Sequence, residues 1–268
     1  MIYSLTVTTP QTLLPFLREK CPLSGKALKR AIDAKQCKIN GRVEFFSTHP
    51  LKVGDRIELK LKERPAPARA EILYEDEALV IINKPAFVES VAPAGLHLVH
   101  RLDKETSGAL LLAKNKQVLE SLIALFAERK VEKRYLAIAD APFEMTEWQI
   151  DNFLVQKGGY QGGTLWGSAP NGKRAITRFR VLKRGESCAL VQCMPVTGRT
   201  HQIRVHLFEM GHPILGDWQY ARRFCSTYDA PRVLLHAEEI AFPHPITQVP
   251  LRVRAPIPKD LEACVSSL

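Results

Sequence analysis

One segment of the sequence places a carboxylate where it could take part in catalysis. Asp103 stands between Arg101 and Lys104, and it is followed by the polar turn Thr106-Ser107-Gly108 and the apolar run 109–113. Hydroxyls and amides that bind locally, with a buried strand behind them, would hold the carboxylate rigidly, as a catalytic group requires. Taken alone, such a residue is more often a turn carboxylate paired with a neighbour, here Arg101.

Two further polar side chains lie in patterned segments later in the chain. Tyr135 lies in the strand-like segment 133–139, and Arg204 lies in the segment 198–207, whose sequence is Gly-Arg-Thr-His-Gln-Ile-Arg-Val-His-Leu. By itself Tyr135 would be a half-buried strand tyrosine. Arg204 would be either a structural arginine or one that binds a phosphate group.

Together these segments carry a family resemblance. His-Arg-Leu-Asp-x-x-Thr-Ser-Gly at 100–108 is followed in order by Lys-x-Tyr-x-Ala at 133–137, the arginine motif, and further motif stretches at 211–217, 234–237 and 242–247. The chain thus resembles the RluA-type pseudouridine synthases over roughly residues 72 to 256. The resemblance implies an enzyme that detaches uracil from a uridine in RNA without releasing it, turns it, and rejoins it through a carbon atom. It also implies that no cofactor is used.

The resemblance assigns roles by motif position. Asp103 would be the catalytic residue, acting on the ribose or the base of a uridine flipped out of its stack. Tyr135 would stack on the flipped uracil, and Arg204 would pair with Asp103 and keep it ionised. Arg101 would enter the space that the base leaves, and Leu234 or Leu235 would form an apolar wall, although buried core leucines are the ordinary interpretation.

Two departures from the family pattern concern loops. After Asn83-Lys84-Pro85 the family's usual Ala-Gly is Ala86-Phe87 here, and Tyr220 is followed by Ala221 where glycine is common. We therefore expect the loops beside the active site, and with them the choice of substrate, to differ.

Other site types fit the sequence less well. The stretch 167–173 resembles a phosphate-binding loop, but Arg174 stands where the magnesium-binding hydroxyl belongs, so we predict a glycine-rich surface loop. The histidines lack the spacing of a metal site, and we expect no metal. A base-removing hydrolase built on a carboxylate, and an RNA-binding assembly factor that has lost catalysis, stay open as alternatives.

Pattern and composition predict two domains of the α+β class. A proline-containing polar stretch at 65–70 is the predicted linker between an RNA-binding domain at 1–64 and a catalytic domain at 71–268. In the latter we expect a mixed, mainly antiparallel sheet with flanking helices, including strands at 79–84, 109–113, 133–139, 177–183, 189–195 and 252–255 and a helix capped by Asn115.

The N-terminal quarter is the basic part of the chain. Residues 1–69 carry 14 Lys and Arg against 6 Asp and Glu, so this quarter supplies +8 of the net charge of +10 of the whole chain. Two short helices, the hairpin 37–43 around Asn40-Gly41 and a Val-Gly-Asp turn resemble the alpha-L RNA-binding domain, first seen in a ribosomal small-subunit protein, over residues 11 to 61. The resemblance places these cations near RNA phosphates: Lys26, Lys29, Arg30, Lys35, Lys38 and Arg42.

Composition limits where the protein works and on what. Six scattered cysteines without a Cys-x-x-Cys pair, and no secretory leader pattern, predict the cytoplasm. No apolar run reaches the roughly 18 to 20 residues of a membrane span. We expect a monomer that acts on structured RNA, ribosomal RNA first and transfer RNA as the alternative, because a small RNA-gripping domain adds affinity through effective concentration.

Overall fold

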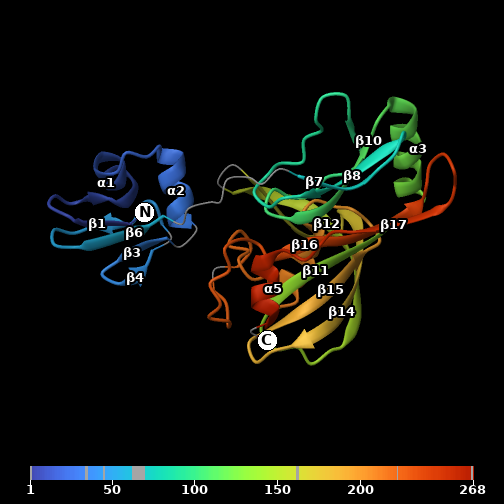
Figure 1. Cartoon of the computed structure of the whole chain (residues 1–268). Coiled ribbons are helices and arrows are strands. Elements are labelled where there is room, and N and C mark those ends of the chain that lie inside the picture. The colour runs from blue at the N-terminus through green and yellow to red at the C-terminus, as the bar shows by residue number, and fades with distance from the viewer. Residues whose placement is uncertain are drawn as a thin grey trace. The chain divides into compact units, whose positions relative to one another are not determined.

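The computed structural model describes residues 2–33, 36–44, 46–61, 70–160, 163–221, 223–266 and 268. The chain folds into two compact units, Met1–Ala66 and Pro67–Leu268 (Figure 1). Each unit has its own apolar core, so each is described by itself.

The N-terminal unit packs two helices against a small sheet. The sheet has the order β1 (Ile2–Thr6), β6 (Arg56–Lys60), β3 (Cys37–Ile39) and β4 (Arg42–Val43), and β2 (Gln11–Thr12) pairs with β5 (Pro50–Leu51) beside it. The helices are α1 (Leu13–Lys20) and α2 (Gly25–Asp33). Asn40 and Gly41 both have positive φ, which closes the predicted hairpin with the twist that such turns favour.

The larger unit is built on one long mixed sheet. In spatial order its strands are β13 (Gly163–Ser168), β12 (Glu147–Tyr160), β14 (Lys173–Arg184), β15 (Cys188–Pro195), β11 (Glu132–Asp140), β16 (Leu235–Pro243), β10 (Ser107–Ala113), β8 (Leu79–Lys84) and β7 (Glu71–Glu75). β17 (Pro250–Arg254) pairs with β16, and β9 (His97–Leu98) pairs with β10. Among the strand pairs described, only β10 and β16 run parallel, so the predicted mixed, mainly antiparallel sheet is confirmed.

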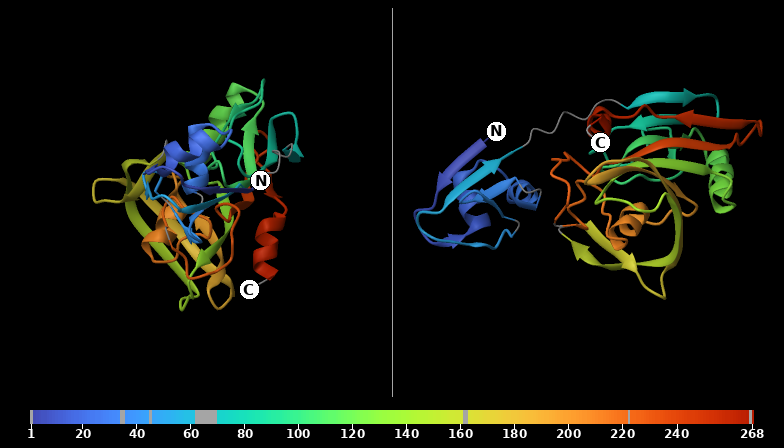
Figure 2. Two further views of the ribbon diagram at one scale, coloured as in Figure 1. Left: turned by 90° about the vertical axis from the view of Figure 1, so that its left-hand side faces the viewer. Right: turned by 90° about the horizontal axis from the view of Figure 1, so that it is seen from below.

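Three helices pack on this sheet (Figures 1 and 2). α3 (Lys116–Ala127) begins at Asn115, whose side chain accepts from Val118 N at 2.9 Å as predicted, and it covers a core shared with β8 and β10. α4 (Gln202–Glu209) lies within the curve of β12, β14 and β15. α5 (Lys259–Ser266) packs through Leu261 and Cys264 into another core of the same unit, which lies around β11 and β15.

One loop predicted from sequence in this unit has different bounds in the structure. The predicted loop at 167–173 is shorter than expected, because β13 continues to Ser168 and β14 starts at Lys173, which leaves a four-residue turn at 169–172. Within the described ranges, no helix is long and apolar enough to cross a membrane.

Gly108 occupies a position that admits no side chain. Its φ is 112°, and an added Cβ would lie 2.2 Å from Ala237 O on the parallel neighbour β16. We expect Gly108→Ala to lower the free energy of unfolding by about 2–4 kcal/mol, from left-handed strain and from separation of the two strands. Urea unfolding measures this. Gly158→Ala is the control, because its methyl would meet nothing within 4 Å, and equal losses in the two variants would contradict the explanation.

Candidate active site

Asp103 lies in the loop between β9 and β10, and hydrogen bonds hold that loop. Ser90 Oγ accepts from Leu102 N at 3.0 Å and donates to Leu102 O at 2.9 Å. Lys84 Nζ donates to Lys104 O at 3.4 Å and to two carbonyls of its own loop at 2.9 and 2.8 Å. Burial lowers the pKa of Lys84 to about 8, and these carbonyls are what a buried ammonium needs as partners.

A second buried cation holds the other end of the loop. Arg232 is 3% exposed and donates from Nη1 to Glu105 O at 3.1 Å. The same guanidinium forms a bidentate pair with Asp260 of α5, at 2.6 and 2.9 Å. Glu105 Oε2 accepts from Val233 N at 3.1 Å. The loop that carries Asp103 is therefore tied both to α5 and to the segment before β16.

Arg204 projects from α4 and is fixed by three groups. Its Nε and Nη2 donate to the Asp217 carboxylate at 2.6 and 2.8 Å, and Nη2 also donates to Gln219 Oε1 at 2.7 Å. The remaining nitrogen, Nη1, donates to Asp103 Oδ2 at 3.2 Å. Burial alone would lower the pKa of Arg204, but Asp217 and Asp103 raise it, so the guanidinium stays charged.

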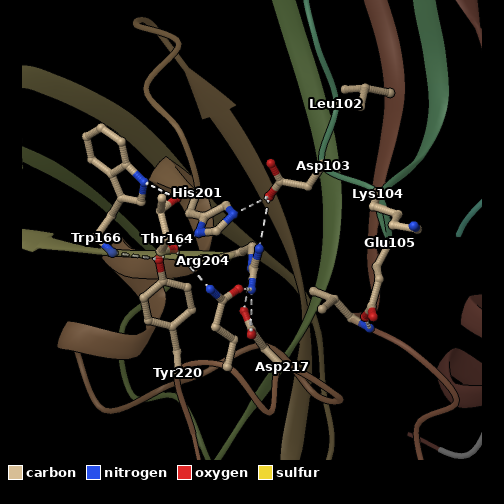
Figure 3. Close-up of polar contacts among 12 residues, drawn as sticks. Leu102, Asp103, Lys104, Glu105, Thr164, Trp166, His201, Arg204, Asp217 and Tyr220 are labelled. Atoms are coloured by element: carbon tan, nitrogen blue, oxygen red, sulfur yellow. Dashed lines mark hydrogen bonds and ion pairs between the residues drawn. The ribbon is translucent and has the colours of Figure 1, made fainter. Parts of the chain in front are cut away.

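Protein groups consequently hold the Asp103 carboxylate through only one of its two oxygens, among the residues described (Figure 3). Oδ2 accepts from Arg204, and His201 Nε2 lies 3.9 Å from the same oxygen. Among the described residues no hydrogen bond or ion pair reaches Oδ1, and the side chain is 28% exposed. A charged oxygen without a protein partner, on a rigid loop, can accept a proton from a bound nucleotide or attack its sugar.

A buried polar chain holds α4 in place. Gln202 Nε2 donates to Thr177 Oγ1 at 2.8 Å, and that hydroxyl lies 3.0 Å from His206 Nδ1. His206 Nε2 lies 2.9 Å from Asn152 Oδ1, an acceptor, so this nitrogen carries the proton. The neutral imidazole thereby links α4 to β12 and β14, and it holds in place the helix that carries Arg204.

We expect the larger unit to lose stability in mild acid because His206 is buried and neutral. Burial lowers the pKa of His206 from 6.5 to about 4. As pH falls, the unfolded chain takes up the proton first, so the stability that depends on neutral His206, complete above pH 6.5, is lost by about 1.4 kcal/mol per pH unit down to pH 4. Burial also lowers the pKa values of His100 and His236, so these two residues add to the total slope. Denaturation at several pH values measures this slope. His206→Gln should make it shallower, and an unchanged slope would contradict the assignment.

The other residues singled out from sequence in this unit lie in different environments. Tyr135, on β11, is half-buried against Leu102 and Ala237; burial raises the pKa of its phenol, and the charge of nearby Asp103 raises it further. Arg101 is exposed. Leu234 and Leu235, at 0% and 4% exposed, lie in the core around β11 and β15.

The structure describes the side chains of only three of the six N-terminal cations predicted to bind RNA. Lys29 on α2, Lys38 on β3 and Arg42 on β4 have exposed side chains. Lys26 and Arg30 lie on α2, but their side chains are outside the described part of the chain, as is the whole of Lys35.

Phe87 gives the first departure from the family pattern a structural meaning. Its φ is 69°, in the left-handed region that favours glycine and is uncommon for a bulky residue. The loop after β8 therefore keeps a backbone shape suited to glycine while it carries an aromatic ring. The ammonium of buried Lys84 binds the same loop at Val88 O.

Comparison with known proteins agrees with the geometry. The sequence model of a family described as RNA pseudouridylate synthase matches residues 88–209. Ribosomal large subunit pseudouridine synthase C of Vibrio vulnificus is 38% identical over 223 residues, which cover 74% of this chain and 69% of that protein. The chain belongs to the RNA pseudouridylate synthase family. It is therefore an RNA pseudouridine synthase, an isomerase.

Other family members extend the match. The protein of the same name from Escherichia coli K12 is 33% identical over 246 residues, covering 82% of this chain and 77% of that protein. Among solved structures, human RNA Pseudouridylate Synthase Domain Containing 1 aligns with a TM-score of 0.65 at 27% identity, covering 76% of this chain and 90% of that one. The family predicted from the motifs is confirmed.

Several residues of the site are not among those singled out from sequence. Asp217 and Gln219 hold Arg204, His201 approaches Asp103, and Tyr220 contacts His201. The segment 211–217 matches the family as a motif, but the motif alone gives its carboxylate no role. Its closing Gly-Asp marks a tight turn, and only the fold brings that turn beneath α4.

Proposed function

We propose that this enzyme isomerises one or more uridines of large-subunit ribosomal RNA, with Asp103 as its catalytic residue. The observation that carries the proposal is the asymmetric carboxylate: Arg204 holds Oδ2, and Oδ1 is left for the nucleotide. The choice of RNA is supported by the relatives of similar sequence, which are named as ribosomal large subunit pseudouridine synthases. Transfer RNA is the alternative substrate.

The proposed reaction breaks one bond and forms another within one nucleotide. The bond from uracil N1 to ribose C1′ breaks, uracil turns, and C5 bonds to C1′; the hydrogen on C5 leaves and N1 gains one, so the atoms balance. Asp103 acts on the extruded nucleotide, and Tyr135 stacks on its base, a contact worth about 1–3 kcal/mol. Arg101 fills the space in the RNA, and Leu234 or Leu235 backs the pocket wall. No metal or cofactor takes part.

The N-terminal unit would add affinity for RNA. We assign residues 1–64 to an alpha-L type RNA-binding domain, 65–70 to a linker and 71–268 to the catalytic domain, in a monomeric cytoplasmic enzyme. Two helices beside a hairpin with exposed Lys29, Lys38 and Arg42 support this assignment. Phosphate contacts of this kind hold an RNA without reading its sequence.

Pseudouridine mapping on total RNA tests the function directly. Cells with and without this protein are compared, and the expected difference is loss of pseudouridine at one or a few positions of large-subunit ribosomal RNA. A loss confined to transfer RNA would favour the alternative substrate. Free uracil released by the purified enzyme would instead indicate a base-removing hydrolase, and unchanged maps together with RNA binding would indicate a binding protein without catalysis.

Removing single cations from the N-terminal unit should weaken RNA binding through charge alone. We expect Lys29→Ala, Lys38→Ala and Arg42→Ala each to lower affinity and to reduce the slope of log affinity against log salt by about 0.7–0.9, one released counterion per phosphate contact. Binding at several salt concentrations measures the slope. Lys20→Ala, which removes an exposed cation of α1, is the control. The same slope in all four variants would contradict the assigned RNA face.

A further inference from the structure

His201 stands at an unusual backbone position beside the catalytic carboxylate. It precedes α4 with φ 54° and ψ 17°, a left-handed conformation that costs energy for a residue with a side chain. The side chain makes no cap hydrogen bond to α4. The imidazole instead bridges two groups: Nδ1 lies 2.8 Å from Tyr220 Oη, and Nε2 lies 3.9 Å from Asp103 Oδ2.

The hydrogen bonds around Tyr220 set which imidazole nitrogen carries the proton. Trp166 N, on β13, donates to Tyr220 Oη at 3.2 Å. Burial raises the pKa of Tyr220 to about 12, so the phenol keeps its own proton and can donate it. His201 Nδ1 lies at hydrogen-bond distance from the phenol oxygen, and we infer that it accepts the hydrogen bond from this hydroxyl, because Trp166 N already donates to the oxygen. Nδ1 is then unprotonated, and the proton of the neutral ring sits on Nε2, facing Asp103.

The same strand holds the other group on Asp103 Oδ2. Gln219 Nε2 donates to Thr164 O on β13 at 3.0 Å, while Gln219 Oε1 accepts from Arg204 at 2.7 Å. Both donors aimed at Oδ2 can therefore be traced, each through one side chain, to the backbone of β13 (Figure 3). The Tyr220 ring also lies over the Arg204 guanidinium, 5.1 Å from its centroid.

We propose that His201 is a positioning residue for Asp103: its Nε2–H, oriented by Tyr220 and the β13 backbone, secures Oδ2 during the reaction so that Oδ1 stays directed at the nucleotide. The inference rests on the proposed role of Asp103. The 3.9 Å separation is too long for a hydrogen bond, so a shift of about 1 Å closes it when substrate fills the site. Burial and the charge of Arg204 lower the pKa of His201, which keeps the imidazole neutral.

The variants follow from the atoms that each side chain retains. Asparagine tolerates the left-handed backbone but places its amide near the Nδ1 position, whereas glutamine reaches the Nε2 position. We expect His201→Asn to lower the single-turnover rate about 10- to 100-fold with KM changed less than twofold, and His201→Gln to recover most of that loss. His212→Asn is the control, since His212 binds Asp140 O away from the site.

A double-variant cycle tests whether Tyr220 acts through His201. Tyr220→Phe keeps the ring over Arg204 but removes the donor to Nδ1, so a smaller loss of rate is expected. Combined with His201→Asn it should cost nothing further, because the two residues act as one unit. Additive losses, or an effect on KM alone, would overturn the proposal.

Nitrogen NMR of the histidine rings tests the arrangement without any activity. The His201 signals, identified by their loss in His201→Asn, should show the Nε2–H tautomer in wild type and a mixture in Tyr220→Phe. An Nδ1–H tautomer in wild type would overturn the proposal. If the enzyme formed no pseudouridine on any RNA, the proposed function would fail, and this measurement would still decide the His201 arrangement.

Discussion

Asp103→Asn is expected to abolish pseudouridine formation, with a loss of at least about a thousandfold in rate. Asparagine has nearly the same shape and can still meet Arg204 Nη1, which lies 3.2 Å from Oδ2. It lacks the negative charge, so it can neither accept a proton from the ribose nor attack it. Release of tritium from C5 of labelled uridine in a ribosomal RNA fragment measures the rate, because that hydrogen leaves when C5 bonds to the sugar.

The control for this variant separates loss of chemistry from loss of structure. Glu77→Gln neutralises an exposed carboxylate of the same unit and should leave the rate unchanged. RNA affinity and urea unfolding of Asp103→Asn should both stay close to wild type, because the loop is held by Lys84, Ser90 and Arg232 rather than by the carboxylate. Full activity in Asp103→Asn would remove the catalytic assignment.

Much of the catalytic unit could be predicted from sequence because its signals are local. The buried run before Pro85, the all-apolar strand after Gly108 and the Asn115 cap each depend on residues within a few positions of one another. The carboxylate and its turn are likewise contiguous. Such features can be predicted from a single sequence because neighbouring residues determine them.

What could not be predicted depends on residues far apart in the chain. Strand β12 alternates polar and apolar residues only over 147–151 and contains Gly158 and Gly159, so its full length does not follow from the sequence pattern. Arg204 meets its main partner, Asp217, only because a turn returns beneath α4. The proton position proposed for His201 depends on the hydrogen bond from Trp166 N to Tyr220, and Trp166 lies on the edge strand of the sheet. No local pattern reports such contacts.

Arg204→Met should both destabilise the enzyme and inactivate it, and the two effects have separate causes. Asp217 is 1% exposed, and its two oxygens accept from Arg204 at 2.6 and 2.8 Å. Removing the guanidinium leaves this carboxylate buried and unpaired, at a cost of about 3–5 kcal/mol in the free energy of unfolding. Asp103 loses the guanidinium that holds Oδ2 at the same time, so its carboxylate is free to turn away from the nucleotide.

The double variant Arg204→Met with Asp217→Leu separates these causes. It replaces the buried pair with apolar side chains, and such replacements are often neutral in stability, so unfolding in urea should return to within about 1 kcal/mol of wild type. The tritium-release rate should stay as low as in Arg204→Met alone, because nothing restores the donor on Asp103 Oδ2. Recovery of the rate together with stability would show that Arg204 only stabilises the fold. The loop and His201 would then orient the Asp103 carboxylate without Arg204.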